Sequence, residues 1–397
     1  MRMPALRAAF GRFAESPAAM ISLAITLVML FAAIFAPLLA PTDPYDLTRL
    51  QLADALKPVG SRQLGPAEEA RVSIHVGAGP AEATGPGTVL RGVSAVPCGE
   101  GCVELAAVPP DVALASLQIR NLPRGAGVDQ ARKHPVQPWW TVTAPAGPVR
   151  ITGLTGAADI QVIAKSLPQE TGLTFYLGTD GFGRDMLSAI LYGIRISLTV
   201  GLVTAATAMV LGTGLGLVAA WRGGVADALI MRAVDFMLGF PALLVGLVVL
   251  ALLGSGVDKV IFAIVLVQWC YYARTTRSVA LGELGKEYVE AARVQRLSQG
   301  RILLRHILPN CLPQIIVLFT LNIAAAIALE SSLSFLGIGL PLTKPSLGML
   351  IANGYEYIFS HKYWISIYPG LVLLVMIVAL NLLGDRLRDL NNPRLDR

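Results

Sequence analysis

The sequence offers few thiol or imidazole groups that could do chemistry, because it contains four cysteines and four histidines in 397 residues. Cys98 and Cys102 flank a Gly-Glu-Gly turn between two strand-like runs. A disulfide across this hairpin loop is favoured in an oxidising compartment. Free thiols are the first alternative. A metal site is the second, since His75 and His134 are the only further soft ligands of that region and both are distant in sequence.

No other motif predicts a catalytic site. The run 282–287 comes closest to a phosphate-binding loop, but it lacks the Walker spacing and has no Ser or Thr after Lys286 to hold Mg²⁺. The chain contains no HExxH motif, and its histidines are scattered singly. We therefore expect no catalytic residues and no bound cofactor in this chain, which disfavours an enzyme.

The composition indicates a membrane protein, since 54% of the residues are hydrophobic, only 15% are charged and the mean hydropathy is +0.61. Six apolar runs predict spans: 18–40, 196–220, 230–253, 260–272, 315–329 and 365–383. The first run is too long for a signal-peptide core and no small-residue cleavage site closes it, so it predicts a retained anchor. The predicted fold class is an all-α polytopic membrane protein with six transmembrane helices.

Basic residues predict the orientation of these spans, because short loops rich in Lys and Arg stay on the cytoplasmic side. They precede the first span, separate the second from the third, follow the fourth and end the chain. Both termini are therefore expected in the cytoplasm. The net charge of +6 is explained by this bias, which disfavours nucleic-acid binding. The terminal arginines concerned are Arg2, Arg7, Arg12, Arg386, Arg388, Arg394 and Arg397.

A long stretch between the first two spans differs from the rest of the chain. It is rich in Pro and Gly and carries short β-branched or alternating runs. The runs cover 71–76, 88–96, 102–108, 112–119, 139–143, 149–151 and 159–164. They predict an inserted, extracytoplasmic, mainly-β domain. The predicted organisation is 1–45 for the N-terminus and first span, 46–170 for the insertion and 171–397 for the remaining five spans.

Several polar residues lie in or beside the spans. Asn322 falls in the middle of the fifth span and Glu330 near its outer end. Such side chains are costly in a membrane unless they face protein or water, so both are candidates to line a translocation path, with a packing or gating hydrogen bond as the alternative. Asp180, Arg184 and Asp185 precede the second span. We expect them to pair with each other or with neighbours, and contact with an extracytoplasmic protein is the alternative.

A charged segment follows the fourth span and has the pattern of two short helices. Residues 281–291 carry apolar side chains at spacings of three, four and three, which places them on one helical face. Ser298 is a suitable N-cap for a second helix, and Pro309 marks its predicted end. Small Ala291 and Ala292 permit close approach of another surface. Docking to a partner is favoured over the alternative of a helix lying on anionic lipid.

Several segments of the chain carry motifs of a known family. The loop contains Glu-Ala-Ala at 290–292 and Arg-His-Ile-Leu-Pro-Asn at 305–310. These residues resemble the EAA loop in the permease subunits of bacterial ABC importers. Further similar segments are LGTDGFGRDMLS at 177–188, ESSLSFLG at 330–337 and NLLGDRLRD at 381–389. The chain is most similar to the C-type subunits of dipeptide, oligopeptide and nickel importers, the DppC- and OppC-like proteins, over about 175–395 and the first span.

The resemblance implies a type I importer permease that forms half of a translocation pathway for dipeptides or oligopeptides. Nickel or other metal chelates and glutathione-type substrates are the alternatives, and a membrane-anchored sensory or adhesion module is the rival class. The implied partners are a homologous second permease, two ABC ATPases that bind the ATP and Mg, an extracytoplasmic solute-binding protein and membrane lipid.

The resemblance also implies that the EAA loop at 281–310 couples the spans to an ATPase. The residues concerned are Glu290, Ala291, Ala292, Arg293, Arg296, Arg301, Leu308 and Pro309. Two features depart from the family. Relatives have Gly six residues after the glutamate, where this chain has Arg296, so the turn is expected near Ser298 or at Gly300. Relatives also have only a short connector where this chain has the 60–167 insertion.

Overall fold

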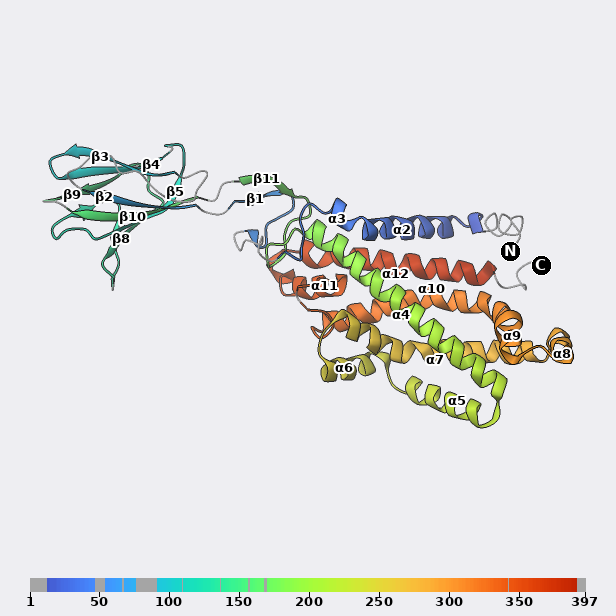
Figure 1. Cartoon of the computed structure of the whole chain (residues 1–397). Coiled ribbons are helices and arrows are strands. Elements are labelled where there is room, and N and C mark those ends of the chain that lie inside the picture. The colour runs from blue at the N-terminus through green and yellow to red at the C-terminus, as the bar shows by residue number, and fades with distance from the viewer. Residues whose placement is uncertain are drawn as a thin grey trace. The chain divides into compact units, whose positions relative to one another are not determined.

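The computed structural model describes residues 13–46, 54–65, 68–75, 91–108, 110–135, 137–155, 158–167, 170–341 and 343–390. The chain forms two compact units (Figure 1). The helical unit comprises Met1–Ser61 and Thr174–Arg397, and the β unit comprises Arg62–Leu173. The sequence predicts an insertion from 46 to 170. The observed β unit begins 16 residues later, at Arg62, and ends close to the predicted end, at Leu173. The orienting arginines Arg2, Arg7, Arg12, Arg394 and Arg397 lie outside the described residues.

The helical unit contains eleven α-helices, a π-helical turn and a 3₁₀ turn among the described residues. They are α2 (Pro17–Ile34), α3 (Ala36–Leu39), α4 (Met186–Arg222), α5 (Gly224–Leu238), α6 (Ala242–Leu253), α7 (Val257–Leu284), α8 (Glu287–Val294), α9 (Gln299–Ile302), η3 (Leu303–Ile307), α10 (Leu308–Phe335), α11 (Leu347–Tyr355), η4 (Ile358–Ser360) and α12 (Trp364–Leu390).

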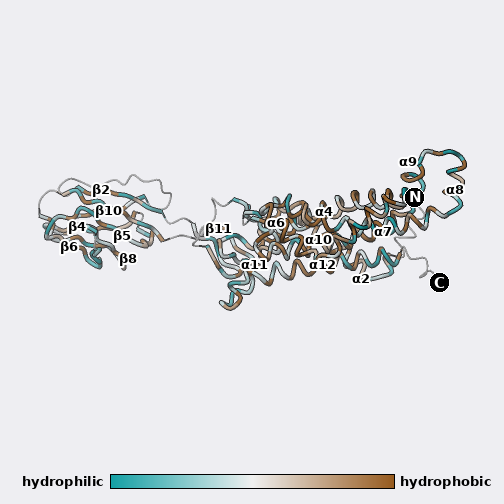
Figure 2. The backbone as a smooth tube through the Cα atoms, turned by 90° about the horizontal axis from the view of Figure 1, so that it is seen from below, coloured by the Kyte–Doolittle hydropathy of each residue, from teal (hydrophilic) through white to brown (hydrophobic). Residues whose placement is uncertain are grey.

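Four helical segments of the described residues are long and apolar enough to cross a bilayer, and a bent pair of helices would make a fifth span. The four are Pro17–Ile34, Met186–Arg222, Gln299–Phe335 and Trp364–Leu390. Figure 2 shows apolar residues along α4, α10 and α12, and hydrophilic residues at α8. The fourth predicted span lies within α7, whose apolar run is bounded by charged residues at both ends. Length and composition of the helices therefore support several spans, and they do not by themselves give six.

The third predicted span is two helices, because α5 and α6 meet at an angle of 89°. Gly239 ends α5 and Pro241 precedes α6. Proline has no N–H for the helical ladder and disfavours helical backbone at the residue before it. The apolar run predicted as a span over 230–253 is therefore not one continuous helix, since it continues across a helix break.

Two glycines four residues apart let α4 pack closely on α7. A Cβ added at Gly212 would lie 2.2 Å from the carbonyl oxygen of Trp269, and one at Gly216 would lie 2.5 Å from that of Ala273. Gly214 lies between them, and a Cβ added there would meet no described residue within 4 Å. This small-residue spacing allows the two backbones to approach closely.

The β unit contains two larger sheets, and a separate strand pair includes its first and last residues. The strands are β1 (Ser61–Leu64), β2 (Glu69–His75), β3 (Gly92–Gly99), β4 (Cys102–Val108), β5 (Leu114–Arg120), β6 (Gly127–Val128), β7 (Arg132–Lys133), β8 (Trp139–Thr143), β9 (Val149–Thr152), β10 (Asp159–Ser166) and β11 (Glu170–Phe175). Their orders are β2-β10-β5-β8-β7, β3-β4-β9-β6 and β1-β11. Seven strands overlap the seven predicted runs. Within those runs, Val76 and 88–90 lie outside the described residues. The strands β1, β6, β7 and β11 were not predicted.

Alternation along the strands builds the core of the β unit. In β10, Ile160, Val162 and Ala164 are buried, and the residues between them are more exposed. This period of two is what a sheet with one covered face requires. At the tip of the β3–β4 hairpin, Cys98 and Cys102 are joined by a disulfide, with their Cα atoms 5.2 Å apart.

Candidate functional site

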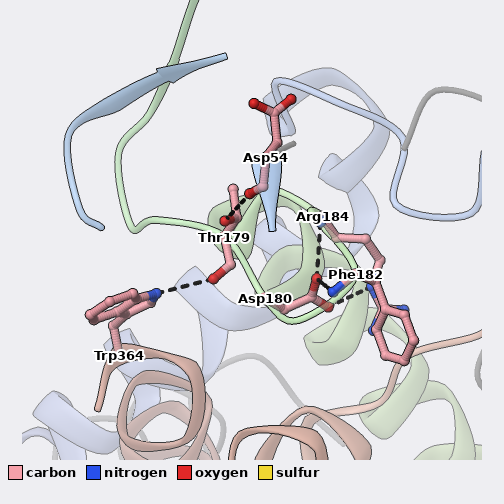
Figure 3. A network of polar contacts seen from close by, with 6 residues as sticks. All are labelled: Asp54, Thr179, Asp180, Phe182, Arg184 and Trp364. Atoms are coloured by element: carbon pink, nitrogen blue, oxygen red, sulfur yellow. Dashed lines mark hydrogen bonds and ion pairs between the residues drawn. The ribbon is translucent and has the colours of Figure 1, made fainter. Parts of the chain in front are cut away.

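A buried ion pair holds the segment that precedes α4 (Figure 3). Arg184 Nε donates to Asp180 Oδ2 at 2.6 Å, and the two side chains are 1% and 0% exposed. The other oxygen, Asp180 Oδ1, accepts from the backbone N–H groups of Phe182 and Arg184. The Arg184 guanidinium also lies 5.0 Å from the Phe182 ring centre. The carboxylate and the guanidinium therefore fix the shape of one tight turn.

Thr179 ties this turn to two other parts of the helical unit. Its hydroxyl donates to the carbonyl oxygen of Asp54 at 2.6 Å, and its own carbonyl accepts from Trp364 Nε1 at 3.1 Å (Figure 3). Asp54 lies shortly before the β unit and Trp364 begins α12. The turn therefore joins the chain after α3, the start of α4 and the start of α12.

Asp185 caps the first turn of α4. Its Oδ2 accepts from the backbone N–H of Ser188 at 2.8 Å and from the Ser188 hydroxyl at 2.6 Å. Burial raises the pKa of the Asp185 carboxyl, while these hydrogen bonds act in the opposite direction. The side chains of Asp180, Arg184 and Asp185 are at most 2% exposed. Their bonds within the chain position the start of α4, and the buried side chains present no surface to another protein.

The 281–310 segment folds as two short helices joined by a left-handed turn. The helix α7 ends at Leu284 and α8 begins at Glu287. The predicted single helix over 281–291 is therefore wrong, because the backbone breaks between these two helices. The turn after α8 is made by Arg296, with φ of +56°. The turn was expected from a non-helical residue near Ser298 or from Gly300. The structure has the left-handed residue two positions before Ser298, at Arg296, and places Gly300 inside α9.

Ser298 is the N-cap residue of α9, as predicted, but Pro309 does not end the second helix. The chain runs as one helical segment from α9 through the π-helical turn η3 into α10. Pro309 lies in the first turn of α10, next to this widened turn. A missing N–H is tolerated at such a position. The charged loop thus continues directly into a long apolar helix.

Tyr288 links the loop to the helices on both sides. Its hydroxyl donates to Glu283 Oε2 at 2.8 Å and accepts from Asn310 Nδ2 at 3.0 Å. Glu283 lies in the last turn of α7, and Asn310 lies in the first turn of α10. Burial raises the pKa of the Tyr288 phenol, and the hydrogen bond to Glu283 raises it further. The hydroxyl is therefore protonated at neutral pH and can donate. The loop is therefore bonded to the ends of two long helices.

Most of the residues assigned to coupling are exposed on this loop. The exposed ones are Glu290, Ala291, Arg293, Arg296, Arg301 and Pro309, and Leu308 is half-buried. Ala292 is 5% exposed and packs with Val289, Ile302 and Ile307 in the core of the loop. Ala292 therefore supports the fold of the loop from inside and does not offer the approach surface that its small size predicts.

Two contacts connect the loop to the end of α4, and sequence reasoning missed both. Trp221 Nε1 donates to Gln299 Oε1 at 3.2 Å. The Arg293 guanidinium lies 5.2 Å from the Trp221 ring. In the sequence, Trp221 stands beside Arg222 at the end of an apolar run, and this position could have indicated a contact with the loop. Arg293 thus has a partner within the chain.

A cavity of about 490 Å³ lies between α6, α7 and α10. Asn322 lines it, together with Gln268 and Tyr271 of α7. Glu330 does not. Its carboxylate is 0% exposed and accepts from the hydroxyls of Ser197, Ser331 and Ser334. Of the two residues predicted for a pathway, the structure thus places Asn322 at a cavity and Glu330 in a closed hydrogen-bond cluster between α4 and α10.

Comparison with known proteins matches these features to transport proteins. Residues 212–397 match the profile of the family described as "Binding-protein-dependent transport system inner membrane component". Residues 5–58 match the "N-terminal TM domain of oligopeptide transport permease C". The di/tripeptide transport system permease protein DppC of Pseudomonas aeruginosa is 38% identical over 221 residues, which are 56% of this chain and 73% of that protein.

The dipeptide transport system permease protein DppC of Alkalihalophilus pseudofirmus is 37% identical over 242 residues, which are 61% of this chain and 79% of that protein. The chain belongs to this permease family. A MetNI methionine ABC transporter structure is also similar, with a TM-score of 0.43 and 16% identity over 52% of this chain and 98% of that chain. The permease is therefore a multi-pass inner-membrane protein of a transport family, and the resemblance to DppC- and OppC-like subunits is confirmed.

Arg296 has a left-handed backbone conformation at the turn of the loop, and we expect this conformation to destabilise the permease. A non-glycine residue in this conformation costs roughly 1–2 kcal/mol. We expect Arg296→Gly to raise the free energy of unfolding by about 1 kcal/mol, because part of the gain is lost to the freer unfolded chain. Thermal unfolding in detergent measures the change.

The matched control is Gln295→Gly. Gln295 has φ of −72°, which is open to any residue. Glycine there should lower the stability by about 0.5–1 kcal/mol. A shift of the same sign in both variants would show that Arg296 carries no strain.

Proposed function

We propose that this chain is one of two permease subunits of an ATP-driven importer of peptides. The two DppC relatives are di/tripeptide and dipeptide permeases, which supports the substrate class. We further propose six crossings, supplied by α2, α4, the bent pair α5 and α6, α7, α10 and α12, with both termini in the cytoplasm. Under this arrangement the β unit is extracytoplasmic, because it follows the first crossing.

The observation that carries the proposal is the turn at Arg296. The residue that stands in place of the family's glycine keeps the left-handed conformation of a glycine. We propose that the two short helices of the loop form the surface to which the ATPase subunits bind. The proposed partners are two ABC ATPases, which hold the ATP and Mg, a homologous second permease, a solute-binding protein and lipid.

The bonded connections of the loop suggest how ATPase movement would reach the spans. Tyr288 is bonded to both α7 and α10, and Trp221 connects the loop to α4. A displacement of the loop would therefore move three long helices together, as in rigid-body switching. We propose that closure of the ATPase dimer is transmitted in this way.

Uptake by the complete transporter tests the function. In cells that lack the chromosomal gene, a plasmid copy should restore uptake of labelled dipeptides and tripeptides, and the ATPases should co-purify with the permease. The panel also includes nickel and glutathione. Restored uptake of either in place of peptides would support the alternative substrates, and co-purification without any uptake would contradict a transport role for these ligands.

Replacing the β unit tests its contribution to reception of the solute-binding protein. The strands β1 and β11 are paired, so their ends lie about 5 Å apart and a short Gly-Ser linker can replace 65–169. We expect the helical unit to stay folded, because its core clusters are its own. Affinity for the solute-binding protein should fall about tenfold or more, as for loss of part of an interface. Unchanged affinity would exclude the β unit from reception.

A further inference from the structure

The helix α4 carries two charged residues, and their spacing matches the thickness of a bilayer. Arg195 and Arg222 are the only charged residues of this 37-residue helix. They are 27 positions apart, which corresponds to about 40 Å along an α-helix. A hydrocarbon core together with both headgroup regions is about 40–45 Å thick. The two arginines are therefore spaced to stand at the levels of the two opposite headgroup regions.

The exposed side of α4 between these arginines is apolar. Its large exposed side chains are Leu202, Val203, Val210, Leu211, Leu215 and Val218. Arg195 is exposed and lies seven residues before the first of them, which is about two helical turns, so it continues the same side of the helix. Tyr192 precedes Arg195 by one turn, and tyrosines are enriched at membrane interfaces. The apolar side therefore ends at a charge that lipid tails cannot satisfy.

Arg195 lines a small hollow at this level of the helix. The hollow has a volume of about 130 Å³, and its other lining residues are Tyr45, Ile196, Thr199 and Val257. Tyr45 comes from the chain after α3, and Val257 is the first residue of α7. Three separate parts of the helical unit therefore meet around this hollow.

The polar side chains of this cluster are donors that lack acceptors. Arg195 forms no side-chain hydrogen bond or ion pair with any residue that the structure describes. The rings of Tyr45 and Tyr192 meet edge to face with 4.9 Å between their centres, and neither hydroxyl has a hydrogen bond to the described part of the chain. Neither hydroxyl is among the fully enclosed polar atoms without a partner, so both stay accessible. Thr199 differs, because its hydroxyl donates to the Arg195 carbonyl.

Two charges act on the Tyr45 phenol in opposite directions. Burial raises the pKa of Tyr45 to about 12, Arg195 acts to lower it, and Asp43 raises it. The hydroxyl is therefore protonated at neutral pH and can donate. Asp43 is exposed, and its Oδ1 accepts from the Tyr45 backbone N–H at 2.9 Å, but it forms no ion pair with Arg195. The cluster thus offers a cation and hydroxyl donors beside a separate carboxylate.

We propose that Arg195, Tyr45 and Tyr192 hold the phosphate of a phospholipid headgroup. A bilayer presents phosphates at this level, and their oxygens accept hydrogen bonds from guanidinium and hydroxyl groups. Asp43 adds a preference for an ethanolamine headgroup, because its carboxylate attracts the ammonium and opposes a headgroup without positive charge. The inference depends on α4 crossing the membrane, and it does not depend on the transported substrate.

Lipid binding by the purified full-length permease in detergent tests the site. Native mass spectrometry measures the dissociation constants of phosphatidylethanolamine and phosphatidylglycerol, and inorganic phosphate is the third ligand. Arg195→Gln should weaken the tightest binding of phosphatidylethanolamine about tenfold, the effect of one charge-assisted hydrogen bond. The matched control is Arg124→Gln, which removes the same charge from an exposed position of the β unit and should leave the dissociation constants unchanged.

Three further variants separate the parts of the site. Tyr45→Phe keeps the ring and removes one donor, so it should weaken phosphatidylethanolamine binding roughly threefold to tenfold. Arg195→Lys keeps the charge and should bind this lipid more tightly than Arg195→Gln does. Asp43→Asn should bind both lipids but no longer prefer ethanolamine to glycerol, and an unchanged preference would remove Asp43 from the site.

Unchanged phosphatidylethanolamine binding in Arg195→Gln would overturn the proposal. Inorganic phosphate that binds as tightly as the lipids would assign the cluster to a free anion and would overturn the lipid as its source. Loss of the second permease from the complete transporter in Arg195→Gln, with lipid binding unchanged, would assign Arg195 to a contact between permeases. If Arg195→Gln does not fold, Tyr45→Phe decides, and normal lipid binding in that variant would overturn the proposal.

Discussion

Replacement of Asp180 by Ala is expected to lower the free energy of unfolding by about 3–5 kcal/mol, because it leaves a guanidinium buried beside a missing carboxylate. Arg184 is 2% exposed and cannot reach bulk water without moving the turn. The hydrogen bonds of Asp180 to two backbone N–H groups would be lost as well. The measurement is the amount of folded permease in the membrane together with its melting temperature in detergent.

The control for Asp180→Ala is the same change in an exposed ion pair. Asp235 bonds to Arg274 across α5 and α7, and the two side chains are 62% and 54% exposed. Pairs of this kind contribute about 0–1 kcal/mol, so Asp235→Ala should have little effect. The double variant Asp180→Ala with Arg184→Met should recover part of the loss, because no buried charge is then left beside the missing carboxylate. Similar losses in Asp180→Ala and Asp235→Ala would refute the argument from burial.

Reversal of the charge at Glu290 is expected to reduce uptake by roughly tenfold to a hundredfold, while the amount of permease in the membrane stays the same. Glu290 is exposed in the first turn of α8, so its replacement by Lys disturbs no core residue. If the loop contacts an ATPase, the new charge opposes whatever paired with the carboxylate. Uptake and the yield of co-purified ATPase measure the effect.

Glu356→Lys is the matched control for Glu290→Lys. Glu356 is exposed and follows α11, at the end of the helical unit away from α8 (Figure 1). It should leave ATPase co-purification unchanged. Normal uptake and normal co-purification in Glu290→Lys would remove Glu290 from the coupling surface. Ala292→Asp is a poorer test, because Ala292 is buried in the loop and a carboxylate there would disturb folding.

The sequence by itself determined the membrane class, the β-rich insertion and the family. Long apolar runs indicate burial in lipid, and this does not depend on the tertiary contacts. Alternating runs indicate a sheet with one covered face. The strands β4 and β8 begin and end at the predicted residues, because turn residues flank them on both sides. The motifs that resemble permeases needed only residue identity and spacing.

Only the tertiary structure decided which polar residues face a cavity and which are closed off. Glu330 and Asn322 are two helical turns apart on one helix, yet the first is enclosed by serines from α4 and α10 and the second lines a cavity. Gln268 was missed because its hydrogen bond to the Asn322 carbonyl depends on a contact between α7 and α10. The left-handed conformation of Arg296 was hidden as well, since arginine has no preference for it and neighbouring contacts impose it. Burial and pairing depend on residues far apart in the chain, whereas composition and spacing are local.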